Sequence, residues 1–252
     1  MAVEQSDAII LRVYPWSETS LIASIYTRDF GKLSVLAKGA RRAKGPFEAA
    51  LDLLSICRVV FIPKASDALD ILTEAKLQKR FRGGTTELLR LYAGYYIAEL
   101  LDRGLDKGTR QTELYDLAID TLSALEVDAT NVSSAVLRFE MQLLRMTGHL
   151  PTLKLCAHCG EPPDGDGWVL FGVNSGGVVC KSCRPAATNV IRIPRAARDA
   201  MLRHSADQWQ TIDLTETKDS PNAAVRGPIQ RYLTVQMDRK LLLHNYLEEL
   251  GR

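Results

Sequence analysis

The sequence predicts a multi-domain protein of the α+β class, in which a small β-barrel precedes an all-helical domain that carries a four-cysteine insertion. Three observations predict this architecture. Short apolar runs divided by turn residues fill residues 1–80, apolar residues recur at helical spacing from about Thr85, and four cysteines stand in two pairs. We therefore expect the barrel at 1–80 and the helical domain at 81–252.

Five short runs rich in Ile, Val and Leu indicate the strands of the barrel, and Gly, Pro, Asp or Ser separate them. The runs are 8–13, 21–26, 33–37, 56–62 and 69–75. Five strands of this length fit an OB-fold, whose loops and strand face often bind single-stranded nucleic acid or oligosaccharide. An SH3-like barrel or another small sheet is equally compatible with the strand count.

Helical spacing of apolar residues begins after the last of these strands. The predicted helices span about 85–101, 111–125, 133–146, 195–204 and 228–250. Their leucine and aromatic stripes are typical of buried faces, and we assign no cofactor site to them.

Residues 35–45, VLAKGARRAKG, hold four cations and no acid: Lys38, Arg41, Arg42 and Lys44. Small residues separate the cations, so the backbone can approach a partner closely. Because the net charge of the chain is only +2, affinity for a polyanion must come from such local clustering. A second cluster, at 181–203, holds six Lys or Arg against one acid, although a solvated face would explain it equally simply.

Aromatic residues of the barrel region are candidates for stacking on nucleic-acid bases. The candidates are Tyr14, Trp16, Tyr26, Phe30 and Phe47. Most of these rings are expected in the core, and Phe47 is the one that we select for stacking.

Cys156, Cys159, Cys180 and Cys183 form two C-x-x-C pairs separated by twenty residues. This spacing is typical of four-thiolate zinc sites, and 168–173 and 177–179 predict a hairpin between the pairs. We expect one structural Zn²⁺ in a zinc finger at about 150–190, because four thiolates leave no open coordination position. The alternative to a metal site is that the four cysteines are free or redox-active thiols.

Two further residues have no assigned chemistry. We expect His158 to face solvent, and we expect the lone Cys57 in the core.

Signatures of enzymes are absent: the sequence has no G-x-x-x-x-G-K-[ST], G-x-G-x-x-G, G-x-S-x-G or H-E-x-x-H motif. His149, His204 and His244 are scattered near helix ends, where we expect surface or capping roles. The sequence therefore predicts no enzyme and no nucleotide. No signal-like N-terminus and no run of ~18 apolar residues are present, so we expect a cytoplasmic protein without a membrane partner.

Five segments resemble the N-terminal region of the bacterial recombination mediator family RecO: Ile9–Arg12, Ser17–Leu21, Tyr26–Arg28, Gly31–Leu33 and Ala37–Arg42. The final K-G-A-R-R is the most specific of them, and the order of barrel, helices, cysteine pairs and closing helices extends the resemblance loosely over the whole chain.

The resemblance implies an OB-fold followed by a helical domain with a zinc finger. It implies a nucleoid-associated protein of DNA repair and recombination that binds single- and double-stranded DNA and anneals complementary strands. It also implies partners: RecR and single-stranded-DNA-binding protein, with which the family loads the recombinase. Its basic loop matches Lys38, Arg41 and Arg42, and its metal ligands match the four cysteines. Our full set of DNA-binding candidates is Lys38, Arg41, Arg42, Lys44, Arg184, Arg195 and Arg198.

Three other functions remain open from the residues. A zinc-ribbon protein could be an RNA- or ribosome-associated binding factor, or the chain could be a metal-dependent nuclease or other hydrolase, although it lacks clustered carboxylates. The third possible function is that of a scaffold. Its closing helices would hold the acidic tail of a partner, such as that of single-stranded-DNA-binding protein, against four cations: Arg226, Arg231, Arg239 and Lys240.

Overall fold

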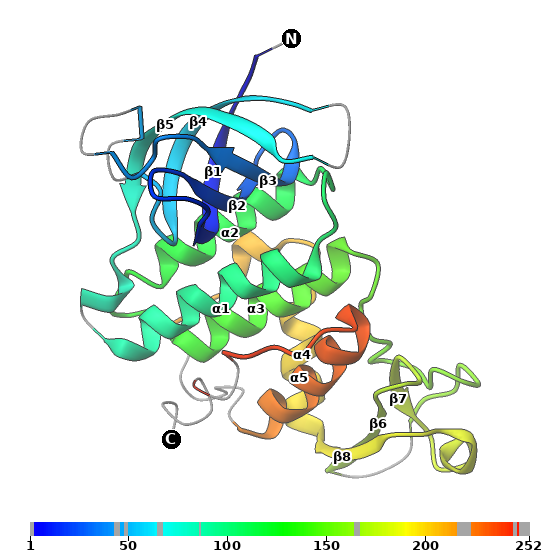
Figure 1. Cartoon of the computed structure of the whole chain (residues 1–252). Helices are drawn as coiled ribbons and strands as arrows, with labels where there is room; N and C mark the ends of the chain where they lie inside the picture. The colour runs from blue at the N-terminus through cyan, green and yellow to red at the C-terminus, as the bar shows by residue number, and fades with distance from the viewer. Residues whose placement is uncertain are drawn as a thin grey trace. The chain divides into compact units, whose positions relative to one another are not determined.

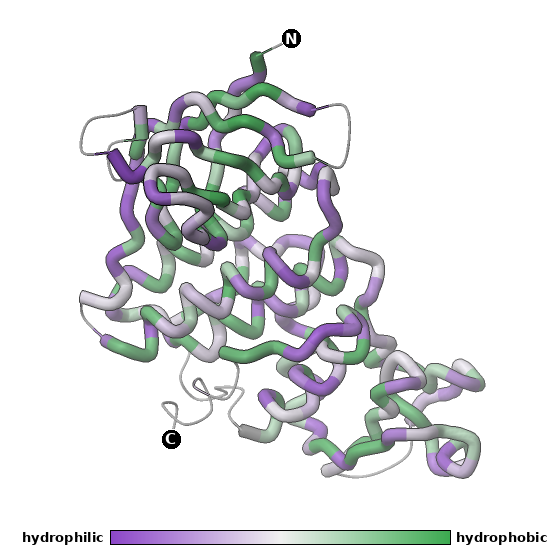
Figure 2. Tube along the Cα trace, in the orientation of Figure 1, coloured by the Kyte–Doolittle hydropathy of each residue, from purple (hydrophilic) through white to green (hydrophobic). Residues whose placement is uncertain are grey.

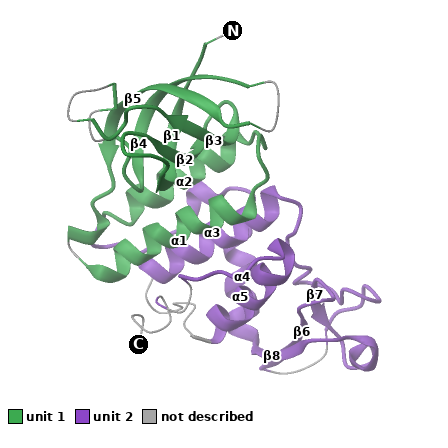
Figure 3. Cartoon of the chain, viewed as in Figure 1, with its two compact units in different colours: residues 1–126 green, residues 127–252 purple. Residues whose placement is uncertain are grey.

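The computed structural model describes residues 3–42, 46–47, 50–64, 68–85, 87–163, 167–215, 223–243 and 246. The chain forms two compact units, residues 1–126 and 127–252 (Figure 3). Two helices, α1 (Leu88–Gly104) and α2 (Thr112–Ala124), therefore belong to the same unit as the N-terminal strands, whereas the sequence analysis drew its boundary at 80–81. None of the described helices has the length and apolar character needed to cross a bilayer.

Five strands form a closed barrel in the order β1-β2-β3-β5-β4 (Figure 1). Their bounds are β1 (Glu4–Pro15), β2 (Leu21–Thr27), β3 (Gly31–Ala37), β4 (Ser55–Ile62) and β5 (Asp70–Arg80). Neighbouring strands run antiparallel except β3 and β5, which are parallel, and β1 pairs with β4 to close the barrel. The fold is the predicted OB-fold.

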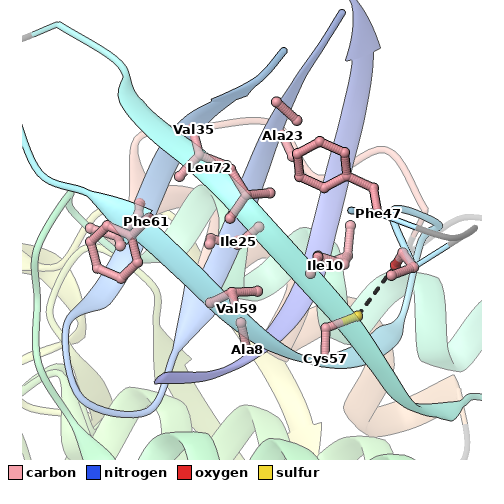
Figure 4. Packing of buried hydrophobic residues seen from close by; sticks show 14 residues of the cluster. Ala8, Ile10, Ala23, Ile25, Val35, Phe47, Cys57, Val59, Phe61 and Leu72 are labelled. Carbon is pink, nitrogen blue, oxygen red and sulfur yellow. Dashed lines mark hydrogen bonds between the residues drawn. The ribbon is translucent and has the colours of Figure 1, made fainter. Parts of the chain in front are cut away.

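The strands form because their apolar side chains alternate toward the barrel interior. Every second residue of β3 is buried, from Gly31 to Ala37, and apolar residues recur along the barrel strands in Figure 2. Figure 4 shows the resulting core of buried side chains. Phe30 packs against this core and meets Phe61 edge to face, with 5.3 Å between the ring centroids. The core is thus contributed by all five strands.

Two residues of this core bear on the sequence-based expectations. The Cys57 thiol is buried and donates to the Ala50 carbonyl at 3.3 Å, and burial raises its pKa to about 11, which confirms a small core residue (Figure 4). Phe47 is only 3% exposed, so its selection as a stacking ring was wrong. The ring fills the barrel because burying a phenylalanine contributes about 1.5–3 kcal/mol.

Polar contacts hold the barrel against the helices of its own unit. The Tyr26 hydroxyl donates to the Gln111 carbonyl at 3.1 Å, and the Ser24 hydroxyl donates to the Asp102 carboxylate at 2.6 Å. The Lys32 ammonium donates to the Asp102 carbonyl at 2.7 Å. Strands β2 and β3 are thus bonded to α1 and to the residue that precedes α2.

In the described residues the second unit contains a small sheet and three α-helices. The sheet has the order β7-β6-β8, with β6 (Trp168–Gly172), β7 (Gly177–Val179) and β8 (Val190–Pro194), and the helices are α3 (Val132–Met146), α4 (Arg195–His204) and α5 (Ala223–Met237). The hairpin, α3 and α4 fall where the sequence placed them, whereas β8 was missed. Helix α5 begins five residues before Pro228, the predicted first residue, and ends at Met237. The predicted helix over 228–250 was therefore wrong for 238–243, which are not helical, whereas 244–245 and 247–250 lie outside the described residues.

The interior of the second unit holds two ionisable residues, Arg226 and His204, that the sequence analysis placed at the surface. Arg226 and Glu140 form an ion pair with Nη2 and Oε2 2.6 Å apart, and their side chains are 7% and 0% exposed. His204 is 5% exposed, and burial together with nearby arginines lowers its pKa to about 4. Arg226 is therefore unavailable to a partner, and the expected surface or capping role of His204 was wrong. His149 is exposed, as expected, and His244 lies outside the described residues.

Candidate nucleic-acid interface and metal centre

A hollow of about 380 Å³ lies on the barrel between the β1–β2 turn and the segment after β3. We call it the basic hollow. It is lined by Trp16, Ser17, Thr19, Ser20, Leu36, Lys38, Gly39 and Arg42. The predicted basic loop and the turn that carries Trp16, one of the candidate stacking rings, thus form one surface.

Hydrogen bonds fix the two turns to each other. The Arg41 backbone N–H donates to the Thr19 carbonyl at 3.0 Å, and the Arg41 guanidinium donates to the Ser17 carbonyl at 3.3 Å. Gly39 has a φ of 74°, a conformation that favours glycine, and its turn is closed by the Arg42 N–H, which donates to the Gly39 carbonyl at 3.0 Å. The cations are therefore presented on an ordered turn.

Lys38, Arg41 and Arg42 are exposed, and within the described residues no carboxylate is paired with any of them. Other arginines of the same unit are neutralised: Arg28 pairs with Asp116 at 3.0 Å, and Arg58 pairs with Asp7 at 3.1 Å. The charge of the basic hollow is thus available to an external anion. Lys44, the fourth predicted cation of the loop, lies outside the described residues.

The predicted cations of the second unit do not form one cluster of free charge. Arg184 is exposed and donates to the Ala187 carbonyl at 3.4 Å, and Arg195 is exposed at the first residue of α4. Arg198 is bound to Asp199 at 2.6 Å, and its side chain is 11% exposed. Arg184 and Arg195 are thus exposed, whereas Arg198 is mostly buried beside Asp199.

A second hollow, of about 340 Å³, lies between the small sheet and α5 within the second unit. We call it the ribbon hollow. It is lined by Trp168, Ile191, Arg192, Pro194, Ala224, Gly227, Pro228 and Arg231. The Arg192 guanidinium lies over the Trp168 ring, 4.9 Å from its centroid. Sequence reasoning missed this grouping because β8, which brings Arg192 beside β6, was not predicted.

The four cysteines of the two pairs come together in the second unit, with their Sγ atoms all within 4.8 Å of one another. Cys159 and Cys180 have Sγ atoms 3.7 Å apart. A tetrahedral site with Zn–S bonds of about 2.3 Å has sulfur–sulfur edges of about 3.8 Å, so the arrangement fits such an ion. The group can hold a metal ion.

The surroundings of the thiols also suit a cation. Although burial opposes it, backbone N–H donors, including that of Cys180 at 3.4 Å, lower the pKa of Cys156 to about 6. Hydrogen bonds to Cys180 and Cys159 raise the pKa of Cys183 to about 12, because like charges so close together oppose a second ionisation. A divalent cation would relieve that repulsion. His158 is exposed, as expected, with Nε2 2.9 Å from the Ser175 hydroxyl.

One unit holds a closed OB-fold barrel, and the other holds a four-cysteine ribbon beside helices. The protein therefore falls in the class of OB-fold proteins that also carry a candidate metal-binding ribbon. Residues 1–81 match the family described as Recombination protein O N terminal, and residues 85–242 match Recombination protein O C terminal. The chain belongs to the RecO family of DNA repair proteins, as its resemblance had indicated.

Relatives of similar length support this membership. The DNA repair protein RecO of Rhodopirellula baltica is 40% identical over 96% of this chain and 93% of its own length. The protein of that name from Symbiobacterium thermophilum is 28% identical over 99% and 98%. That from Rubrobacter xylanophilus is 35% identical over 74% of both chains. A role in DNA repair and recombination follows from the family.

Proposed function

We propose that the chain binds single- and double-stranded DNA through the basic hollow, with little sequence specificity. The observation that carries this proposal is the exposure of Lys38, Arg41 and Arg42 without a carboxylate partner in the described part of the chain. Such cations displace condensed counterions from phosphates, and each neutralised phosphate of a single strand contributes about −0.7 to the log–log salt slope. Lys44 would add to this set.

Strand annealing is the activity that we assign to this binding. Arg184 and Arg195 of the second unit supply a second cationic surface, which the exposed Arg192 and Arg231 extend. A protein with two such surfaces holds two strands and screens their mutual repulsion, so complementary strands pair without nucleotide hydrolysis.

We assign the partners from the family. The chain would act with RecR on DNA coated by single-stranded-DNA-binding protein and so help to load recombinase. The acidic tail of single-stranded-DNA-binding protein would meet cations of and after α5, among which Arg231 and Arg239 are exposed. Arg226 is excluded from this set by its buried pair with Glu140.

One Zn²⁺ ion would be held by Cys156, Cys159, Cys180 and Cys183. Bound there, zinc would cross-link the two turns of the ribbon, and four thiolates would leave no position for water or substrate. We therefore propose a structural ion and no enzymatic activity. Incubation of labelled DNA with magnesium tests this directly, and cleavage that depends on the protein would contradict it.

Fluorescence annealing of complementary oligonucleotides, without nucleotide and with or without the cognate single-stranded-DNA-binding protein, tests the proposed function. We expect faster annealing with the wild-type chain and a lower rate with Lys38→Ala, Arg41→Ala and Arg42→Ala combined. The matched control, Arg28→Ala, removes an arginine that is already paired with Asp116 and should leave the rate unchanged. Equal rates for all variants, or stronger competition by structured RNA than by single-stranded DNA, would contradict the proposal.

A further inference from the structure

Trp16 is 63% exposed, whereas the large rings of Tyr26, Phe47 and Phe61 in the same barrel are buried. Exposure of one apolar side chain is ordinary, but this indole lines the basic hollow beside Lys38 and Arg42. An aromatic face next to two cations in a hollow is the chemistry that recognises a nucleotide.

The indole is carried by an ordered turn. The backbone N–H of Trp16 donates to the Ser20 carbonyl at 3.0 Å, and the backbone N–H of Ser20 donates to the Ser17 hydroxyl at 3.2 Å. The same turn is tied to the basic loop by the bond from the Arg41 N–H to the Thr19 carbonyl. The turn that carries the indole and the turn that carries the cations are therefore held beside each other before any ligand binds, which lowers the ordering cost of binding.

We infer that the basic hollow binds one unpaired nucleotide, with its base stacked on Trp16 and its phosphate on Lys38 and Arg42. This inference rests on the proposed DNA binding by the barrel. A base in duplex DNA already stacks on its neighbours on both faces, so it offers no free face to the indole. The stack therefore makes the hollow selective for single strands, whereas the cations alone act on either form.

This selectivity deepens the annealing function. While a strand is unpaired, the hollow contacts the base of one nucleotide as well as its phosphate. When the strand pairs, the base is withdrawn into the duplex and only the phosphate contacts remain. The duplex product is thus held less tightly than the substrate, which favours its release.

Three ligands of equal length separate the base contact from the phosphate contact: an oligothymidylate, the same oligomer without bases, and a duplex. We expect Trp16→Leu to weaken oligothymidylate binding about fivefold or more, the low end for one base stack, and to leave binding of the other two unchanged. Trp16→Phe should restore part of the loss. Tyr14→Leu, a control at an exposed ring outside the hollow, should change none of the three affinities.

An unchanged oligothymidylate affinity in Trp16→Leu, or an equal loss on all three ligands, would overturn the stacking inference. Failure of the proposed function is distinguishable, because Lys38→Ala with Arg42→Ala would then leave all three affinities and the salt slope at wild-type values. Because Trp16 is exposed, we expect the same thermal unfolding curve for wild type and Trp16→Leu.

Discussion

Arginines of the barrel loop and two arginines of the second unit differ in the partners that the fold gives them. Arg41 and Arg42 stand exposed on a barrel turn with no paired carboxylate in the described residues, whereas Arg226 and Arg198 of the second unit are bound to Glu140 and Asp199. Glu140 is 86 residues from Arg226 along the chain. An acid-poor stretch of sequence therefore does not by itself make an acid-poor surface.

The difference follows from the elements that carry the arginines. A turn such as 38–42 meets few other segments, so its local sequence decides which charges surround it. A helix such as α5 buries one face against other elements, and residues far away in sequence then determine the partners of its side chains.

Cys180→Ser removes one ligand of the cluster, and we expect it to release the metal and unfold the ribbon. Zinc sites of this kind contribute on the order of 10 kcal/mol to folding in isolated peptides. Metal content should fall, and hydrogen exchange should accelerate across 150–194 but not in the barrel. Cys57→Ala, the control at the remaining cysteine, should keep its metal. Full amide protection of 150–194 in metal-free Cys180→Ser would contradict the structural role.

Glu140→Gln leaves the Arg226 charge buried without its counter-charge, which should cost about 3–5 kcal/mol in urea denaturation. Replacing both residues, by Glu140→Leu with Arg226→Met, should restore stability because no buried charge remains. Asp207→Asn is the exposed control: it breaks the Arg145 pair, whose Asp207 side chain is 88% exposed, and should cost about 1 kcal/mol or less. Equal losses at Glu140 and Asp207 would remove the distinction between buried and exposed arginine pairs.

His204 should make stability fall in acid. Its pKa is lowered to about 4 in the folded chain from an ordinary value of 6.5, because of burial and the charges of Arg203, Arg138 and Arg226. Between those values the unfolded chain takes up a proton that the folded chain does not, so stability present above pH 6.5 is lost as the pH falls toward 4. The loss is about 3 kcal/mol. His204→Leu should flatten this part of the stability curve, and an unchanged curve would argue against a buried neutral imidazole.

Gly39→Ala should produce the smallest effect. At a φ of 74° an alanine costs about 1–2 kcal/mol, although its Cβ would meet only the Arg42 side chain, at 3.6 Å. We expect weaker DNA binding, because the turn that presents Lys38 and Arg42 is strained. Gly148→Ala is matched in strain, with a φ of 78° and no neighbour within 4 Å, and should lower stability while leaving DNA affinity unchanged. A loss of affinity in Gly148→Ala as well would show that the effect is not specific to the basic hollow.

Patterns along the chain predicted most of the elements. The five strands and the helices α1, α2, α3 and α4 were found because alternation and helical spacing are local properties. The parallel pairing of β3 with β5 could not follow from strand spacing, since it depends on contacts between distant segments. Strand β8 was missed because Val190–Pro194 is short and lies within a stretch of cations.

The candidate site was predicted unevenly for the same reason. The cysteine cluster and the exposure of Lys38, Arg41 and Arg42 depend on local spacing and charge, and both were foreseen. The exposure of Trp16 and the burial of Phe47 were not predicted, because nothing in their local sequence shows which ring the barrel encloses. The loss of Arg226 to Glu140 depends on a distant partner, which only the fold reveals.

The central claim is that the cations of the basic hollow are free to neutralise phosphate. Titration of single-stranded DNA binding against salt tests it most directly. Removing Lys38, Arg41 and Arg42 together should lower the log–log slope by about 2, at about 0.7 for each phosphate contact, whereas Arg198→Ala should leave it unchanged. Identical slopes for wild type and the triple variant would contradict the account.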